Sequence, residues 1–236
     1  MKKFYSISQY PGNTGKYFYS NFFKFYNFDA EYIPLGSSNV RQTLHEILPL
    51  ASGISISMPF KQEVIELIDI KSNSVIEYNS CNTLKIQSNA IHGYNCDLNG
   101  VIELCKYFDA NDEITILGNG CMANMFKKYI NQDHITQYAK SLKNWDNRHK
   151  SANVIINCTA LGTSEKTSPL EFIPNKTKMI IDLSIGDNNL KKLCYENNII
   201  YFGGITFYKA QFLKQFEIYT DIIADADFFD YINTKK

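Results

Sequence analysis

The sequence lacks a long apolar run, an excess of either charge and a secretion signal, and each absence excludes a class of protein. No apolar stretch in the 236 residues approaches the roughly 20 residues that a membrane-spanning helix needs. Basic and acidic residues balance at 24 each, so nothing suggests nucleic acid or an anionic membrane as a partner. The first ten residues, MKKFYSISQY, have a basic flank but no apolar core after it, which is not the pattern of a signal peptide.

The cysteines and histidines are scattered rather than grouped. No CxxC pair occurs among the six cysteines, which fits reduced thiols better than a disulfide framework or a zinc site. The four histidines show no metal-ligand spacing either. We therefore expect a soluble, cytoplasmic protein without a bound metal.

Short β-type runs alternate with longer amphipathic segments, a pattern typical of βαβ units and a largely parallel sheet. Strands are expected near 4–8, 30–35, 53–57, 153–162, 179–186 and 199–204, with two antiparallel strands around a Ser-Asn turn within 81–97. Helices are expected near 17–27, 39–50, 60–70, 97–108 and in an aromatic-rich tail over 206–233. The domain boundary is expected inside the helix that follows Asp97.

A glycine motif stands where a buried strand runs into a helix, ILGNGCMAN at 116–124. Gly118 and Gly120 allow a tight turn and a close approach of backbone N–H groups to a pyrophosphate, at the positive end of the helix. Ala123 satisfies the need for a third small residue. The alternative is that this glycine pair is only a turn between a strand and a helix.

The segment after the next strand favours NADP over NAD. No acidic residue clearly ends that strand, where a partner of the ribose 2′-hydroxyl is expected. Lys140 and Lys143 follow instead, and lysines suit a 2′-phosphate.

A second group of polar residues combines SISMPFK (55–61) with Asn82 and Asp97. Pro59 cannot sit inside a central strand, so it marks a strand end or a first helical turn. Side chains at the carboxyl ends of parallel strands face the edge where ligands bind in open α/β folds. Taken singly, Lys61 could be a solvated helix lysine, Asp97 a helix cap and Asn82 a turn residue.

Together these segments resemble the shikimate dehydrogenase family, in the order in which that family carries its motifs. SxSxPFK resembles its strand-end lysine motif, with Ser55 and Ser57 in place of Asn and Thr. The matching segments are Asn-Thr at 82–83, NCDLNG at 95–100, LGNGCMA at 117–123, INCTALG at 156–162 and GITFYKAQFLKQF at 204–216.

The resemblance implies a two-domain α/β enzyme that transfers hydride between a cyclic polyol acid and NADP. It implies an N-terminal α/β substrate-binding catalytic domain (1–99) and a reduced, Rossmann-like NADP-binding domain (100–205). The C-terminal helices (206–236) would pack back on the first domain. The partner would be a small cyclic polyol acid, with the chain a monomer or a homodimer.

The resemblance also assigns roles to single residues. Lys61 and Asp97 match the catalytic pair, and because an alcohol must lose its hydroxyl proton as hydride departs, a base within hydrogen-bond reach is needed. The two would share protons as a coupled pair. Matched substrate positions are Thr14, Lys16, Ser57, Asn82 and Gln211. Matched cofactor positions are Gly118, Asn119, Gly120, Cys121, Ala123, Lys140, Thr159, Gly204 and Phe207.

Three departures from the family pattern leave alternatives open. Thr14 and Lys16 replace two serines that hold the substrate carboxylate, so Lys16 would pair with a carboxylate or face water. Ile185 stands where a tyrosine is usual. Ala139-Lys140-Ser141 replaces Asn-Arg-Ser/Thr, and the second helix of the nucleotide half is reduced to something like 140–150. The alternatives are a redox-inactive relative that binds a metabolite or partner, and an enzyme for a more anionic acid.

Overall fold

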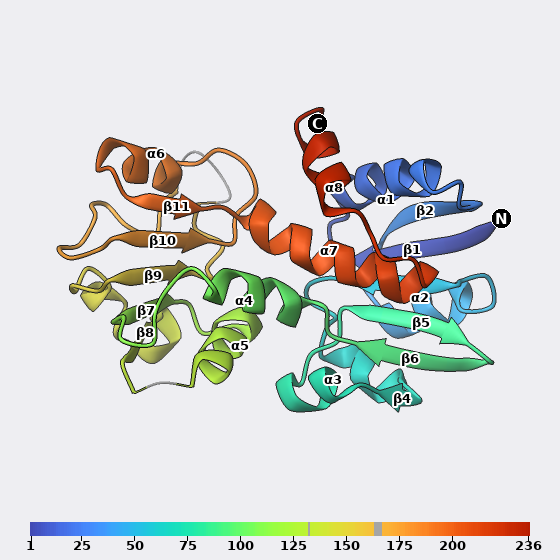
Figure 1. The fold of residues 1–236 in the computed structure, drawn as a ribbon. Coiled ribbons are helices and arrows are strands. Elements are labelled where there is room, and N and C mark those ends of the chain that lie inside the picture. Colours follow the sequence, from blue (N-terminus) through green and yellow to red (C-terminus); the bar gives the residue numbers. More distant parts are fainter. Residues whose placement is uncertain (132, 163–166) are drawn as a thin grey trace. The chain divides into compact units, whose positions relative to one another are not determined.

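The computed structural model describes residues 1–131, 133–162 and 167–236, and the chain forms two compact units. Unit 1 comprises Met1–Leu98 and Gln211–Lys236, and unit 2 comprises Asn99–Ala210. The boundaries fall inside two helices, α4 (Asp97–Cys105) and α7 (Gly204–Thr220), which Figure 1 labels. The functional domains predicted for 1–99, 100–205 and 206–236 stay predictions.

Unit 1 is built on a mixed six-stranded sheet in the order β2-β1-β3-β5-β6-β4. Its strands are β1 (Lys2–Ser8), β2 (Ala30–Gly36), β3 (Gly53–Ile56), β4 (Ile70–Lys71), β5 (Thr83–Gln87) and β6 (Ala90–Tyr94). The pairs of β1 with β2 and with β3 are parallel, whereas β5 runs antiparallel to both β3 and β6. The predicted antiparallel pair within 81–97 is thus confirmed, and Ser88 and Asn89 form its turn with positive φ.

Aromatic packing joins the two ends of the chain in unit 1. The helices of this unit are α1 (Thr14–Phe25), α2 (Val40–Ile47), α3 (Asn73–Tyr78), α8 (Ala226–Asn233) and the second part of α7. In α1 the buried aromatic residues recur at helical spacing, so one face of the helix is apolar. The Phe18 ring stacks on Phe229 of α8 at 4.3 Å between centroids, and Phe22 meets Phe212 of α7 edge-on at 4.9 Å. The predicted return of the C-terminal helices to the first domain is confirmed.

The helix predicted over 60–70 does not form. Only a short 3₁₀ helix, η1 (Glu63–Leu67), occurs there, followed by β4. The reason lies in the backbone of Lys61, whose carbonyl accepts a hydrogen bond from the Cys81 N–H at 2.8 Å. That carbonyl is therefore engaged outside the segment, and the next turn closes instead from Ile65 N–H to Gln62 O.

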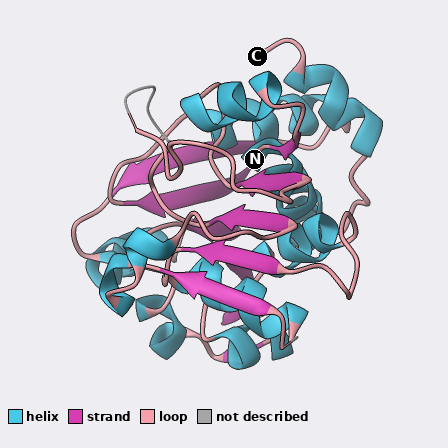
Figure 2. Cartoon of the chain, turned by 90° about the vertical axis from the view of Figure 1, so that its left-hand side faces the viewer, coloured by secondary structure: helices cyan, strands magenta, loops and turns pink. Residues whose placement is uncertain are grey.

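Unit 2 is a parallel five-stranded sheet in the order β11-β10-β9-β7-β8. Its strands are β7 (Ile114–Leu117), β8 (Ile135–Tyr138), β9 (Val154–Asn157), β10 (Met179–Asp182) and β11 (Ile200–Phe202). All five strands are short, with three or four residues each, and β7, β9 and β10 are buried along their whole length. Figure 2 looks onto this unit, with its strands side by side and helices around them. The α/β class and the Rossmann-like half are confirmed.

The connections of unit 2 are uneven. Helix α5 (Cys121–Ile130) links β7 to β8, and α6 (Asn189–Glu196), which the sequence pattern did not predict, links β10 to β11. Between β8 and β9 the structure has only two 3₁₀ turns, η2 (Lys140–Leu142) and η3 (Trp145–Asn147). This is the reduced second crossover that the sequence predicts for 140–150.

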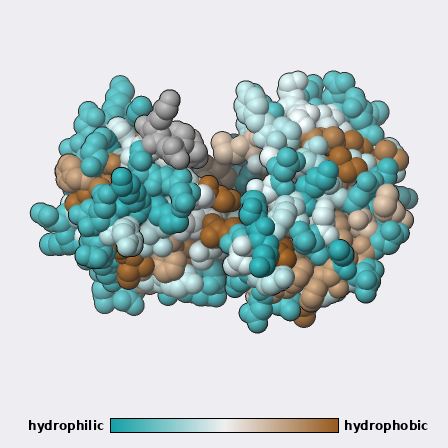
Figure 3. Space-filling model, turned by 90° about the horizontal axis from the view of Figure 1, so that it is seen from above, coloured by the Kyte–Doolittle hydropathy of each residue, from teal (hydrophilic) through white to brown (hydrophobic). Residues whose placement is uncertain are grey.

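The surface is mostly hydrophilic in the view of Figure 3, with apolar side chains in smaller groups. Within the described ranges, none of the helices has both the length and the apolar character needed to cross a bilayer.

Candidate functional site

Lys61 and Asp97 form a direct ion pair in unit 1. Lys61 Nζ donates a hydrogen bond to Asp97 Oδ2 at 2.6 Å. The Asp97 side chain is 2% exposed and the Lys61 side chain 19%, so the carboxylate is buried while the amine keeps access to its surroundings. A pair of this kind, with one partner reachable, is suited to exchange a proton with a bound molecule.

The antiparallel hairpin of β5 and β6 brings Asn82 to this pair. Asn82 directly precedes β5 and Asp97 follows β6, and the register of the hairpin pairs Thr83 with Tyr94. Residues that are far apart in the sequence therefore meet at the open end of the hairpin. Asn82 Nδ2 donates to Asp97 Oδ1 at 2.8 Å, which completes the set of donors on both carboxylate oxygens.

The oxygen end of the Asn82 amide is also held by hydrogen bonds. Its Oδ1 accepts hydrogen bonds from the Cys96 N–H at 2.8 Å and from the Thr83 hydroxyl at 2.7 Å. Asn82 and Thr83 are both buried. The carboxylate of Asp97 at the start of α4 also lies where the helix dipole favours a negative charge.

Two thiols beside the pair are neutral. Burial, with a smaller contribution from the nearby Asp97 carboxylate, raises the pKa of Cys81 and of Cys96 to about 12. Since a thiolate is the reactive form of cysteine, neither side chain is an activated nucleophile.

The other residues predicted to hold a substrate do not bond to this pair. Ser57 is exposed after the end of β3, and Gln211 on α7 makes no side-chain hydrogen bond within the described ranges. Thr14 Oγ1 accepts a hydrogen bond from Lys236 Nζ at 2.9 Å. Lys16 is exposed and lines a separate cavity of about 520 Å³ together with Asp29 and Glu31. Their roles as substrate ligands stay predictions.

A polar cluster that the sequence pattern did not predict lies behind the pair. Its members are Tyr19, Tyr32, Ser55, Gln215 and Tyr219, joined by hydrogen bonds of 2.8 to 3.1 Å. Burial raises the pKa of Tyr32 to about 12 and the pKa of Tyr219 well above its usual value, so both phenols stay protonated as donors. One signal was available, since Gln215 stands four residues after Gln211 and so lies on the same side of α7.

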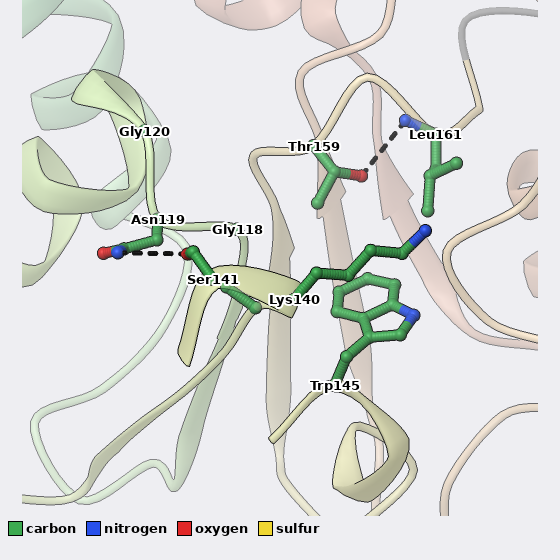
Figure 4. A pocket seen from close by; sticks show the side chains of 9 residues that line it. Gly118, Asn119, Gly120, Lys140, Ser141, Trp145, Thr159 and Leu161 are labelled. Carbon is green, nitrogen blue, oxygen red and sulfur yellow. Dashed lines mark hydrogen bonds between the residues drawn. The ribbon is translucent and has the colours of Figure 1, made fainter. Parts of the chain in front are cut away.

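Unit 2 contains a pocket beside the glycine motif, shown in Figure 4. Its volume is about 360 Å³. It is lined by Gly118, Asn119, Gly120, Ala139, Lys140, Ser141, Trp145, Thr159 and Leu161. Lys140 is the cation among these residues and none of them is acidic, which suits an anionic ligand.

The two glycines contribute to the pocket in different ways. Gly118 has φ +111°, and a Cβ there would lie 3.2 Å from the Cys158 carbonyl oxygen, so this position requires glycine. Gly120 precedes the N-terminus of α5, and a Cβ there would meet no atom within 4 Å. The open space at Gly120 lies where backbone N–H groups and the helix dipole attract a phosphate.

Side chains fix the neighbouring loops. Gln137 Nε2 donates to the Gly118 carbonyl at 2.9 Å and to Asn119 Oδ1 at 3.1 Å. The Thr159 hydroxyl donates to Asn157 Oδ1 at 2.7 Å and accepts from the Leu161 N–H at 3.1 Å. These hydrogen bonds therefore fix the loops that line the pocket, and the interior of the pocket stays open.

Trp145 lines the pocket although it is not among the predicted cofactor residues. It is the single tryptophan of the chain and lies on η3, in the shortened crossover. In Figure 4 its ring and the Lys140 side chain border the same space. The Arg148 guanidinium lies 4.7 Å from the ring centroid and holds the indole by a cation–π contact.

Four of the predicted cofactor residues lie outside this pocket. Ala123 is fully buried and packs α5 on the sheet, and Cys121 is the half-buried first residue of that helix. A Cβ on Gly204 would lie 2.3 Å from the Leu183 carbonyl oxygen, so this glycine allows a close backbone approach. Phe207 packs against Gly100. Their roles toward a cofactor stay predictions.

Ile185, which stands where a tyrosine was expected, is 51% exposed. Within residues 1–131, 133–162 and 167–236, no three His, Cys, Asp or Glu side chains are grouped so that they could hold a metal ion.

Comparisons with known proteins give consistent relatives. No family model matches the chain. It is 28% identical over 211 residues to the shikimate dehydrogenase (NADP(+)) of Clostridium beijerinckii, covering 73% of each chain. It is 25% identical over 238 residues to the protein of the same name from Dictyoglomus thermophilum, covering 86% of each.

Solved structures share the fold over the whole chain. A chorismate mutase/shikimate 5-dehydrogenase fusion protein from Clostridium acetobutylicum gives a TM-score of 0.88 at 21% identity, covering 100% of this chain and 98% of that one. Shikimate 5-dehydrogenase from Thermus thermophilus, solved with NADP(H) and shikimate, gives 0.84 at 14% identity, covering 100% and 99%.

Proposed function

We propose that the chain is a divergent relative of the shikimate dehydrogenases to which it is similar, and that it is an NADP-dependent oxidoreductase. Its substrates would be shikimate and 3-dehydroshikimate or a related cyclic polyol acid. The observation that carries the proposal is the Lys61–Asp97 pair, with the Asn82 amide on the second carboxylate oxygen. The predicted lysine and aspartate lie 2.6 Å apart although 36 positions separate them in the sequence.

The Lys61–Asp97 pair would accept the proton that the alcohol loses and would return it in the reverse reaction. When an alcohol is oxidised, its hydroxyl proton must leave as hydride departs, and a base within hydrogen-bond reach accepts it. Lys61 Nζ is the more accessible of the two groups and would contact the reacting oxygen, while Asp97 Oδ2 holds the amine in place and compensates its charge. Asn82 keeps the carboxylate oriented through Oδ1. In the reverse direction the same pair returns the proton to the carbonyl oxygen.

The pocket of unit 2 fits the anionic part of NADP. The backbone at Gly120 and the N-terminus of α5 would hold the pyrophosphate, and Lys140 with the Ser141 hydroxyl would hold the 2′-phosphate. The Trp145 ring offers a flat apolar surface for the adenine. NADP, when bound, supplies the carbon that accepts or donates hydride.

The single tryptophan makes cofactor binding directly measurable. Titration with NADPH is expected to quench the fluorescence of Trp145 and to transfer its excitation to the reduced nicotinamide. Trp145→Ala is expected to weaken NADPH binding roughly fivefold or more, because stacking of a base on an aromatic side chain contributes about 1–3 kcal/mol. Calorimetry measures NADPH binding in the Trp145 variants, because they no longer contain the fluorescent tryptophan. Trp145→Phe, which keeps a ring, should retain most of the affinity, and equal losses in both variants would contradict a stacking role.

The proposed activity is tested by NADP⁺ reduction with shikimate, quinate and related acids. Purified wild-type protein is expected to reduce NADP⁺ with at least one of them. An inactive protein that nevertheless binds NADPH would point to a different substrate. An inactive protein that binds neither NADPH nor NADP⁺ would contradict the proposal.

A second candidate function is the binding of a metabolite or partner without redox chemistry. The observation that favours it is the crossover from β8 to β9, where two 3₁₀ turns and the segment Ala139-Lys140-Ser141 replace the expected helix and arginine. Calorimetry separates the two functions. Binding of a polyol acid in the absence of any NADP(H) binding would favour this candidate.

A further inference from the structure

Gln215 on α7 is buried, and both the nitrogen and the oxygen of its amide make hydrogen bonds. Its Nε2 donates to the Thr83 hydroxyl at 2.6 Å and to the Asn82 carbonyl oxygen at 3.1 Å. Its Oε1 accepts from the Tyr19 hydroxyl at 2.9 Å and from the Ser55 hydroxyl at 3.1 Å. Gln215 is not among the predicted catalytic or binding residues, yet it contacts Asn82 and Thr83 beside Asp97.

The hydrogen bonds from Gln215 to Asp97 run in one direction. An amide nitrogen only donates, so the Thr83 hydroxyl must accept from Gln215 and offer its own proton elsewhere. Asn82 Oδ1 only accepts, and it lies 2.7 Å from the Thr83 oxygen. The Asn82 NH₂ group is then left for Asp97 Oδ1.

The Thr83 hydroxyl has a competing acceptor. Cys96 Sγ lies 3.3 Å from Thr83 Oγ1, and a hydroxyl carries one proton. When Gln215 Nε2 occupies a lone pair of this oxygen, the hydroxyl is held in the direction of Asn82. Without that donor, the proton is free to turn toward the sulfur, and Asn82 Oδ1 keeps only the Cys96 N–H.

We propose that Gln215 is a positioning residue that acts through the Thr83 hydroxyl to hold the Asn82 amide with its NH₂ on Asp97. The role rests on the proposed function, in which Asp97 and Lys61 form the acid–base pair. An Asn82 amide turned by half a rotation would place an oxygen against the carboxylate and leave the Cys96 N–H without its acceptor. Gln215 therefore connects the tyrosine–serine cluster behind the site to the orientation of the catalytic carboxylate.

Two substitutions interrupt the connection at different points. Gln215→Leu removes the amide NH₂ and the amide oxygen while keeping a similar size, and Thr83→Val removes the hydroxyl while keeping the same shape. Each is expected to lower kcat roughly tenfold, the effect of losing about one buried hydrogen bond, and to leave the affinity for NADPH unchanged. Thr83→Ser, which restores the hydroxyl, should return kcat to within about twofold of the wild type.

The double variant Gln215→Leu/Thr83→Val decides whether the two residues act through the same chain of hydrogen bonds. If they do, its kcat stays close to that of either single variant, because the second substitution removes nothing further. Independent structural effects would instead multiply to roughly a hundredfold loss, which would overturn the proposal. Thr220→Val is the matched control, since it removes a buried hydroxyl bonded to the Phe216 carbonyl of the same helix, and its kcat should not change.

A second measurement does not depend on turnover. The side-chain NH₂ resonance of Asn82, assigned by its disappearance in Asn82→Asp, reports the contact with Asp97 directly. It is expected to move in Gln215→Leu and Thr83→Val but not in Thr220→Val. A resonance that does not move in these two variants would overturn the proposal. If the resonance moves but the wild-type protein has no activity, the positioning role is upheld and only the proposed function is contradicted.

Discussion

The two units of this chain prepare their sites in different ways. In unit 1 the site consists of buried side chains bonded to one another, with Asp97 receiving donors on both oxygens. In unit 2 the pocket is shaped by backbone, with glycines at the turn and mainly half-buried or exposed side chains around the space. The comparison indicates that the side chains around Asp97 are oriented by one another, whereas the pocket of unit 2 offers its shape and the positive charge of Lys140.

The largest expected effect comes from removing the lysine of unit 1. Lys61→Ala should lower kcat by a hundredfold or more, because a positioned acid–base group contributes roughly 10²–10⁴ in rate. The affinity for NADPH should stay nearly unchanged, because the lysine lies outside the pocket of unit 2. Steady-state kinetics and NADPH titration check this together. Equal losses of kcat and of NADPH affinity would show a structural role and remove the contrast between the units.

Alkaline pH is expected to act on the thiols buried beside the Lys61–Asp97 pair. The folded-state pKa of Cys81 and of Cys96 is raised from 9.0 to about 12. As pH rises above 9, the unfolded chain loses these protons first, so the free energy of unfolding falls from its full value below that pH. Each thiol should account for on the order of 1 kcal/mol of this loss by pH 10.

Denaturant unfolding at pH 8 and pH 10 measures this dependence. The double variant Cys81→Ala/Cys96→Ala should show a smaller difference between the two pH values, whatever its absolute stability. Cys121→Ala, a half-buried cysteine at the start of α5, serves as the control and should keep the wild-type difference. An undiminished difference in the double variant would mean that these thiols do not carry the effect.

Substitutions at the two glycines of unit 2 are expected to differ, with one lowering stability and the other lowering NADPH affinity. Gly118→Ala forces a side chain into φ +111° and is expected to lower the free energy of unfolding by roughly 1–3 kcal/mol. Gly120→Ala meets no atom within 4 Å and should leave stability unchanged. Its methyl group would nevertheless occupy the space where a phosphate approaches the backbone, so NADPH affinity should fall. Thermal unfolding and NADPH titration distinguish the two, and unchanged affinity in Gly120→Ala would place the phosphate elsewhere.

The smallest expected effect concerns the choice between NADP and NAD. Lys140→Ala should weaken NADP⁺ binding by up to about fivefold, since exposed ion pairs contribute about 0.2–1 kcal/mol, and should leave NAD⁺ binding unaltered. Lys143→Ala, a neighbouring lysine that does not line the pocket, is the control. A matching loss for both cofactors would argue against a 2′-phosphate contact at Lys140.

Much of the fold was predictable because its signals are local. The alternating apolar runs, the glycine turn after β7 and the Ser-Asn turn of the β5–β6 hairpin each depend on neighbouring residues. The misprediction over 60–70 has a nonlocal cause, since the Lys61 carbonyl is bonded to Cys81, 20 positions away. Helix α6 was missed because its eight residues carry only a short apolar pattern, with Leu190 and Cys194 buried.

The site was predictable only in part for the same reason. Lys61, Asn82 and Asp97 were identified from ordered motifs, and the structure brings these three into contact. Gln215 and Trp145 were not identified, because their significance depends on what lies against them. A glutamine on an amphipathic helix and a tryptophan after a strand carry no signal until the partners are known.

The sequence by itself determined the class of fold, the order of the motifs and the residue types available for proton transfer and phosphate binding. The tertiary structure decided which of them meet: the hairpin register places Asn82 beside Asp97, and α7 brings Gln215 to Thr83 across 132 positions of the chain. The physical reason is that hydrogen-bond partners in a buried network are chosen by the packing of whole strands and helices. Short-range sequence patterns encode those elements but not the contacts among them.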